Sequence, residues 1–192
     1  MEHDKTNDRG EVLLPIARAA ISQALKVPYN ADESAIWLKE HGACFVTLTQ
    51  HGQLRGCIGS LQAHRPLLAD VKGNAVAAAL HDPRFPSLTA MELSATDIEI
   101  SLLSATEPMH IRNEDDALAQ LRPNIDGVVL EAGFHRATFL PQVWEQLPEP
   151  RTFMAHLKHK AGLPPSYWSG DVKLSRYTVT KWREQDLAKS TV

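Results

Sequence analysis

The stretch Ala43–Ser60, with the sequence ACFVTLTQHGQLRGCIGS, has the pattern of a β-hairpin. The β-branched and aromatic residues of Ala43–Gln50 favour a strand, and His51-Gly52 follows as a tight-turn signal. Gln53–Ile58 then returns as a second strand. We therefore expect two antiparallel strands joined by a two-residue turn.

The register of this hairpin determines which side chains share a face. A two-residue turn pairs Gln50 with Gln53, and continuing the pairing places Val46 opposite Cys57. Because successive side chains of a strand point to opposite faces, this register predicts one face that carries Cys44, Arg55 and Cys57. It leaves open whether the two cysteines, on neighbouring strands, form a redox pair.

Cys57 is the candidate catalytic residue. The thiolate is the nucleophilic form of cysteine, and a cation such as Arg55 on the same face favours it. His64 is a candidate general base if the chain turns back toward the thiol. Backbone N–H groups at Gly59-Ser60 could bind an anion, and Gly56 and Gly59 would leave the face of Cys57 open to a ligand or to another backbone. This predicts a cysteine-centred cleft over Arg55–Ser60 in which Gly56, Gly59 and Ser60 bind a small-molecule substrate.

A structural role for the same segment is the alternative. A cysteine in a strand is usually a small buried residue, and glycines in a strand often mark a bulge. In that case the protein is a non-catalytic adaptor, the glycine-rich strand is its docking surface for a partner protein, and Cys57 is inert. The two hypotheses differ in whether the thiol of Cys57 is exposed and reactive.

Two charged residues in the loop His81–Pro86 extend the candidate site. Asp82 and Arg84 would either bind the substrate at the rim of the cleft or form an internal ion pair that shapes the loop. Glu99 lies opposite the apolar face of its strand, so we expect it to be solvated or paired. If Glu99 instead faces Cys57, it becomes a candidate acid or base.

A metal site is not expected. His156 and His159 lie three residues apart on an expected helix, a spacing that can place two ligands side by side. The further ligands of a zinc site are missing from this segment, so a solvated helix face is the interpretation we adopt. No cofactor is expected either.

The rest of the chain alternates helical periodicity with short strands grouped as hairpins. Helices are expected over Glu11–Val27, Pro66–Leu80, Glu114–Leu121, Pro141–Leu147 and Thr152–Ala161, with short helical turns at Ser34–Glu40 and Thr89–Leu93. Further strands are expected over Asp97–Ser104, Gly127–Glu131, Phe134–Leu140 and Val172–Arg183. Strands in hairpins, rather than in strict β-α-β alternation, predict an α+β fold with a mostly antiparallel sheet and flanking helices.

Composition limits the classes of function. The formal net charge is -3 and no long run of Lys and Arg occurs, which argues against a nucleic-acid partner. Two cysteines do not make a disulfide framework, and the polar N-terminus lacks the apolar core of a signal peptide. The longest helical apolar stretch is interrupted by charges, so no membrane span is expected. We expect a cytoplasmic protein with a disordered leader over residues 1–9, one domain over 10–185 and a tail over 186–192.

The motif Leu54-Arg55-Gly56-Cys57-Ile58-Gly59-Ser60 resembles the signature of the AMMECR domain family. The similarity continues through Val76–Ala79 and Asp82–Phe85, through Glu99–Ser101, and through Asp126-Gly127, Ala137–Trp144 and Lys160–Leu163, and covers roughly residues 10–183. In bacteria and archaea this family is protein A of the AmmeMemoRadiSam system.

The resemblance implies a compact α+β fold with a larger and a smaller subdomain. By the name of the system, it also implies a partnership with a Memo-like protein and a radical SAM enzyme. It implies no particular reaction and no catalytic residues, so the roles of Cys57 and its neighbours remain hypotheses drawn from the residues themselves.

Overall fold

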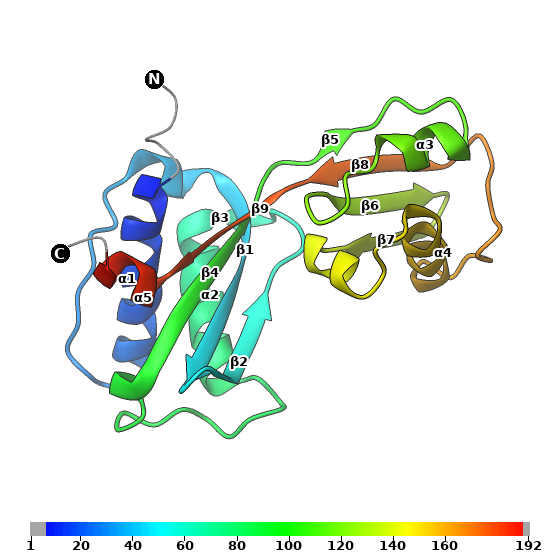
Figure 1. Ribbon diagram of the computed structural model, residues 1–192. Coiled ribbons are helices and arrows are strands. Elements are labelled where there is room, and N and C mark those ends of the chain that lie inside the picture. Colours follow the sequence, from blue (N-terminus) through cyan, green and yellow to red (C-terminus); the bar gives the residue numbers. More distant parts are fainter. Residues whose placement is uncertain (1–6, 190–192) are drawn as a thin grey trace. The chain divides into compact units, whose positions relative to one another are not determined.

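The computed structural model describes residues 7–189, and this part of the chain forms two compact units (Figure 1). The larger unit comprises residues 7–103 and 180–189, and the smaller unit comprises residues 104–179. Each unit has its own antiparallel sheet with helices packed against it. The expected α+β class with a larger and a smaller part is therefore confirmed.

The sheet of the larger unit has the strand order β2-β1-β4-β9. Its members are β1 (His41–Gln50), β2 (Gln53–Gly59), β4 (Thr96–Leu103) and β9 (Val179–Arg183), and the two-residue strand β3 (Arg65–Pro66) pairs with the start of β1. His51 and Gly52 join β1 to β2 with φ angles of 49° and 77°. Two central residues at positive φ give the turn a twist that matches the flanking strands, so the expected two-residue turn is confirmed.

Two long helices, α1 (Asn7–Ala24) and α2 (Leu67–Leu80), pack against one face of this sheet. The core between them consists of fully buried apolar side chains, among them Leu13, Ile16, Ile21, Val46, Leu48 and Ile100. The short helices η1 (Ile36–Lys39), η2 (Leu93–Ala95) and α5 (Glu184–Lys189) complete the unit. The hydrophobic effect thus fixes one face of the sheet against helices, and polar residues of β1, β2 and β4 lie on the other face.

The smaller unit has a sheet of strand order β5-β8-β6-β7. These strands are β5 (Glu107–Pro108), β6 (Gly127–Ala132), β7 (His135–Phe139) and β8 (Lys173–Tyr177), and the helices are α3 (Glu114–Gln120), η3 (Pro141–Glu145) and α4 (Pro150–Lys160). At its core the rings of Trp144 and Phe153 are stacked 3.7 Å apart, and the Trp144 indole N–H donates to the carbonyl of Asp126 at 2.7 Å. The hairpin of β6 and β7 and helix α4 agree with the strands expected over Gly127–Glu131 and Phe134–Leu140 and the helix expected over Thr152–Ala161.

Both expected chain ends differ from the structure. The disordered leader was expected over residues 1–9, but α1 begins at Asn7, and residues 1–6 lie outside the described residues. The tail was expected over 186–192, but α5 continues to Lys189, and residues 190–192 are likewise outside the described part. Within residues 7–189, no helix is long and apolar enough to cross a membrane.

The prediction of one continuous strand over Val172–Arg183 is wrong. This segment contains two strands, β8 and β9, that belong to different sheets and are separated at Thr178. Alternation of apolar and polar residues predicts extended backbone, but it carries no information on which sheet supplies the partner strand. The short helical turn expected at Thr89–Leu93 is also displaced, because the observed turn η2 spans Leu93–Ala95.

Arg18 ties α1 to elements that are distant in the sequence. Its Nε and Nη2 atoms bind the two carboxylate oxygens of Glu184 at 2.5 and 2.6 Å. Its guanidinium also donates to the carbonyls of Thr96 at 2.6 Å and Leu93 at 3.2 Å. Glu184 in turn accepts the N–H of Ile98 at 2.9 Å. Helix α1, strand β4 and the C-terminal helix are therefore held by one hydrogen-bonded ion pair.

We expect Arg18→Met to lower the free energy of unfolding by about 2 kcal/mol, because methionine keeps the apolar stem and removes several charge-assisted hydrogen bonds. Urea denaturation followed by circular dichroism measures the change. The control is Arg112→Met, whose side chain is 87% exposed; a solvated ion pair of that kind contributes about 0.5 kcal/mol or less. Equal effects of the two substitutions would contradict the central role of Arg18.

Candidate functional site

The hairpin register differs from the expected one by a single inserted residue. Gln50 pairs with Gln53 and Thr49 with Leu54, as expected. The register then shifts at Leu48, which pairs with Gly56, so that Arg55 is the extra residue of a β-bulge. The prediction that Val46 lies opposite Cys57 is wrong, since Cys57 pairs with Thr47.

This shift places the two cysteines on opposite faces of the sheet. Cys44 is fully buried in the core against the helices, and this burial raises the pKa of its thiol. Cys57 is half-buried on the other face, where its Sγ lies 3.3 Å from the Thr47 hydroxyl. Because a sheet separates the thiols, the two cysteines cannot form the redox pair that the sequence left open.

The backbone of Cys57 is held by the loop that follows α2. Its N–H donates to Oδ2 of Asp82 at 2.9 Å, and its carbonyl accepts from Nη2 of Arg84 at 3.1 Å. Strand β2 is an edge strand, so these two groups point away from β1 and would otherwise be open to solvent. Asp82 and Arg84 therefore form a clasp on the outer edge of β2, and we use the name Cys57 clasp for this pair.

Asp82 and Arg84 also form an internal ion pair, which was one of the two alternatives that the sequence offered for this loop. Arg84 binds Asp82 through Nη2 at 2.7 Å and Nε at 2.9 Å. These bonds from Arg84, followed by the one from the Cys57 N–H, hold the pKa of the Asp82 carboxyl well below its usual range. The Asp82 side chain is 1% exposed, whereas that of Arg84 is 54% exposed. The Asp82 carboxylate is therefore buried and bound only to protein groups, whereas the Arg84 guanidinium remains exposed to solvent beside Cys57.

Arg55 does not have the role that the sequence suggested. Its guanidinium binds Oε1 of Glu92 at 3.1 and 3.2 Å and donates to the carbonyl of Pro86 at 2.8 Å. The side chain is only 11% exposed. A buried arginine that is paired with a carboxylate has a packing and positioning role, so the argument for an Arg55-activated thiol no longer applies. Arg84 is the cation that contacts Cys57, through the carbonyl group of that residue.

The two glycines of the motif are required for close packing. A Cβ atom on Gly56 would lie 2.1 Å from the carbonyl oxygen of Ala78 in α2. A Cβ atom on Gly59 would lie 2.2 Å from the ring of Phe45. The sequence predicted that these glycines leave space for a ligand or for another backbone. Gly56 has the second role, because it allows the backbone of α2 to approach closely. The space beside Gly59 is filled by an aromatic ring and is not open to a ligand.

Ser60 belongs to a buried polar cluster at the end of β2. Its hydroxyl donates to Asp70 at 2.7 Å, and Arg65 and Asn74 bind the same carboxylate at 2.9 and 3.0 Å. The sequence predicted that the Ser60 N–H could bind an anion. In the structure this N–H donates to the carbonyl of Cys44 at 3.0 Å, so it is not available to a ligand. Asp70 and Asn74 were missed in the sequence, although their spacing of four in an expected helix indicates a shared face.

His64 and Glu99 are the remaining candidates. His64 is exposed on the connection between β2 and β3, and its role as a base stays a prediction. Glu99 lies on the same face of the sheet as Cys57, because both residues pair with Thr47 of β1. Its carboxylate is bound by Arg183 at 2.5 Å and Lys181 at 3.9 Å, which confirms the expectation of a paired carboxylate. Among the described residues, no group of three or more His, Cys, Asp or Glu side chains could hold a metal ion.

Substituting Gly56 tests the packing against α2. We expect Gly56→Ala to lower the free energy of unfolding by about 1–3 kcal/mol, because the added methyl group meets a backbone carbonyl that cannot rotate away. Gly170→Ala is the matched control, because a Cβ there meets nothing within 4 Å. Chemical denaturation measures both, and a neutral Gly56→Ala would show that β2 and α2 are separable.

Glu92 makes stability depend on pH. Hydrogen bonds from the backbone N–H and hydroxyl of Thr89, then from Arg55, lower its pKa from 4.5 to about 2. The ionised carboxylate therefore stabilises the fold fully above pH 4.5, and this contribution is lost as the pH falls toward 2.

We expect the wild-type protein to exceed Glu92→Gln in free energy of unfolding by a constant amount above pH 4.5, and by a shrinking amount at lower pH. Urea denaturation of both proteins in parallel buffers measures the difference. A difference that stays unchanged on acidification would mean that Glu92 does not titrate as its contacts indicate.

Comparison with known proteins agrees with this structure. The AMMECR1 family model matches residues 14–182. A protein from Methanothermobacter thermautotrophicus is 33% identical over 184 residues, which cover 93% of this chain and 96% of that protein. A protein from Sulfolobus acidocaldarius is 35% identical over 191 residues, with 95% and 84% covered. The crystal structure of uncharacterised protein PH0010 from Pyrococcus horikoshii superposes with a TM-score of 0.73 at 30% identity, covering 93% of this chain and 92% of that one. The chain therefore belongs to the AMMECR1 family.

Proposed function

We propose that the protein is a small-molecule-modifying enzyme, or a subunit of one, in which Cys57 is the nucleophile. The position of the thiol carries this proposal. Cys57 is half-buried on the face opposite α1 and α2, with the Thr47 hydroxyl at 3.3 Å from its Sγ and the Arg84 guanidinium bound to its carbonyl. A cysteine that is only partly buried, lies on a strand and has a cation bound to its backbone offers a setting in which a reactive thiol can be stabilised.

The surroundings of Cys57 favour an anionic substrate. Arg84 directs a half-exposed guanidinium to this edge of the sheet, and its partner Asp82 is buried, so the cation is the part that solvent meets. In the proposed reaction, Sγ bonds to an electrophilic carbon of the substrate. The bond from that carbon to the leaving group breaks, the leaving group takes the electron pair, and the thiol proton passes to solvent.

The alternative, an adaptor that docks a partner along β2, has weaker support. Strand addition requires free N–H and C=O groups on the edge of a sheet. At Cys57 both outward groups are already bound by the Cys57 clasp. Docking by strand addition would therefore have to open the Asp82–Arg84 ion pair first.

Partnership with a Memo-like protein and a radical SAM enzyme remains part of the proposal. It follows from membership of the AMMECR1 family rather than from any surface of this chain. Such partners would supply or consume the molecule that Cys57 modifies.

Alkylation in the native state tests the central claim. We expect iodoacetamide to label Cys57 in the folded protein, because this residue is only partly buried, and to label fully buried Cys44 only after unfolding. Peptide mass spectrometry identifies the modified residue, so both cysteines can be left in place. Protection of Cys57 until the protein unfolds would end the nucleophile proposal and leave the adaptor function.

The charge of the reagent tests the role of Arg84. The measured quantity is the rate of Cys57 alkylation by the anion iodoacetate divided by the rate with neutral iodoacetamide. We expect this ratio to be about threefold higher in the wild type than in Arg84→Gln, because an exposed charge has a modest effect. The ratio of the two rates isolates charge, since both reagents need the same access. Arg112→Gln, which removes an exposed arginine of the smaller unit, is the matched control. An unchanged ratio in Arg84→Gln would exclude anion binding by Arg84.

A further inference from the structure

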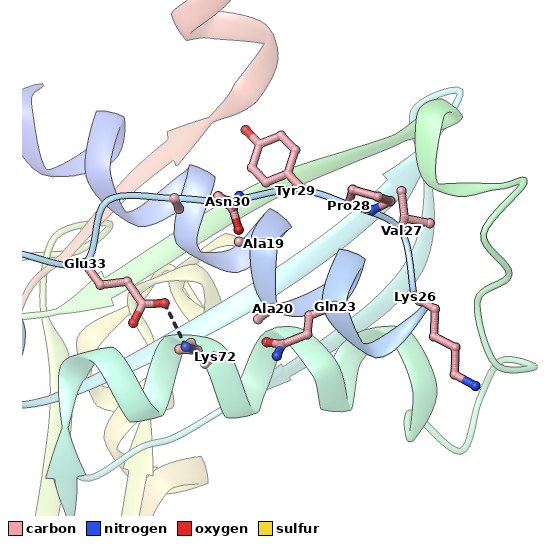
Figure 2. A pocket seen from close by; sticks show the side chains of 11 residues that line it. Ala19, Ala20, Gln23, Lys26, Val27, Pro28, Tyr29, Asn30, Glu33 and Lys72 are labelled. Carbon is pink, nitrogen blue, oxygen red and sulfur yellow. Dashed lines mark hydrogen bonds and ion pairs between the residues drawn. The ribbon is translucent and has the colours of Figure 1, made fainter.

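A concave site lies in the larger unit, lined by α1, α2 and the segment that follows α1 (Figure 2). Its volume is about 420 Å³, and residues 26–33 pass along its rim. Small-molecule sites in proteins have volumes of roughly 300–1,000 Å³, so this groove suits a ligand at the small end of that range. We call it the α1–α2 groove.

Small and polar residues line the α1–α2 groove. Ala19 and Ala20 form its base on α1, where short side chains leave room for a ligand. Gln23 extends from α1 toward α2, and Asn30 projects from the crossing segment (Figure 2). Within residues 7–189, neither side-chain amide is hydrogen-bonded to the protein. Two amides that are free to donate and accept therefore meet the same small space.

An ion pair marks one end of the groove. Nζ of Lys72 lies 2.7 Å from Oε1 of Glu33, and the two side chains are 37% and 36% exposed. An exposed ion pair of this kind contributes little to stability, so a ligand can compete for each partner at small cost. The pair thus presents one positive and one negative group side by side.

A second cation lines the groove away from this ion pair. Lys26 follows the end of α1 at Ala24, and Figure 2 shows it at the opposite end of the groove from Glu33 and Lys72. The positive and negative groups of the groove therefore meet at its Glu33–Lys72 end.

We propose that the α1–α2 groove binds a free α-amino acid. Such a molecule carries an ammonium and a carboxylate on the same carbon atom, which matches the adjacent Glu33 and Lys72. Its carboxylate binds Lys72 and its ammonium binds Glu33, and a polar side chain meets the amides of Gln23 and Asn30. The site is separate from Cys57 and does not depend on the function proposed for it.

L-Glutamine is the first probe, because its side-chain amide complements those of Gln23 and Asn30. Titration followed by nitrogen–proton NMR is expected to shift the backbone signals of residues 26–33 and of Lys72 in a saturable way. N-acetyl-L-glutamine lacks the ammonium and L-glutaminamide lacks the carboxylate, so both are expected to leave these signals in place. The same titration with each of the other standard amino acids defines the preferred side chain.

Substitutions test whether Lys72 and Glu33 bind the two charged groups of the amino acid. We expect Lys72→Ala and Glu33→Gln each to weaken binding about tenfold, the usual effect of losing a hydrogen bond to a charged group. Lys39→Ala removes an exposed lysine that does not line the groove and is expected to bind normally. The proposal is wrong if no standard amino acid shifts these signals, if the two blocked glutamines bind as well as glutamine, or if Lys72→Ala binds like Lys39→Ala.

Discussion

The close approach of β2 to α2 at Gly56 is the constraint on which the site depends. The carbonyl of Ala78 occupies the space where any other residue would place its Cβ atom, so the strand can lie there only with glycine. Arg55, just before this contact, is the inserted residue of the bulge and shifts the register by one. In a regular hairpin Cys57 would pair with Val46 and face the helices. The bulge turns the thiol to the opposite face, beside Thr47.

Arginine–carboxylate pairs then fix the surroundings of this strand. Arg55 binds Glu92, and Arg65 binds Asp70, and each pair joins the motif region to a later part of the chain. Arg84 differs because the carbonyl that it binds, beside its own carboxylate partner, belongs to Cys57 itself. A hydrogen-bonded ion pair is directional, so each of these contacts sets a position as well as a charge. The result is a cysteine on a strand whose backbone is held from both sides.

Local features of this fold could be predicted from the sequence, and long-range ones could not. His51-Gly52 and the alanine-rich stretch before His81 carry their own turn and helix signals, and both are confirmed. The glycines of the hairpin indicated a bulge as one alternative, but neither its position at Arg55 nor the contact of Gly56 with Ala78, which lies on another element, could be predicted from the hairpin. The Asp82–Arg84 ion pair was one of the two alternatives that the sequence offered for its loop. Thr47 was missed because its importance follows only from the shifted register.

The clasp on Cys57 separates two explanations of the same geometry. Covering the N–H and C=O groups of an edge strand protects it from pairing with other chains, and any residue could benefit from that protection. Protection alone, however, does not require a thiol on the open face, since valine or threonine would suit such a strand better. Two hydrogen bonds on one residue also fix its backbone, and a reacting group gains when its position is set by a rigid element. A fixed backbone, a partly buried cysteine and a half-exposed arginine bound to it therefore support the chemistry that we propose at Cys57 over edge protection alone.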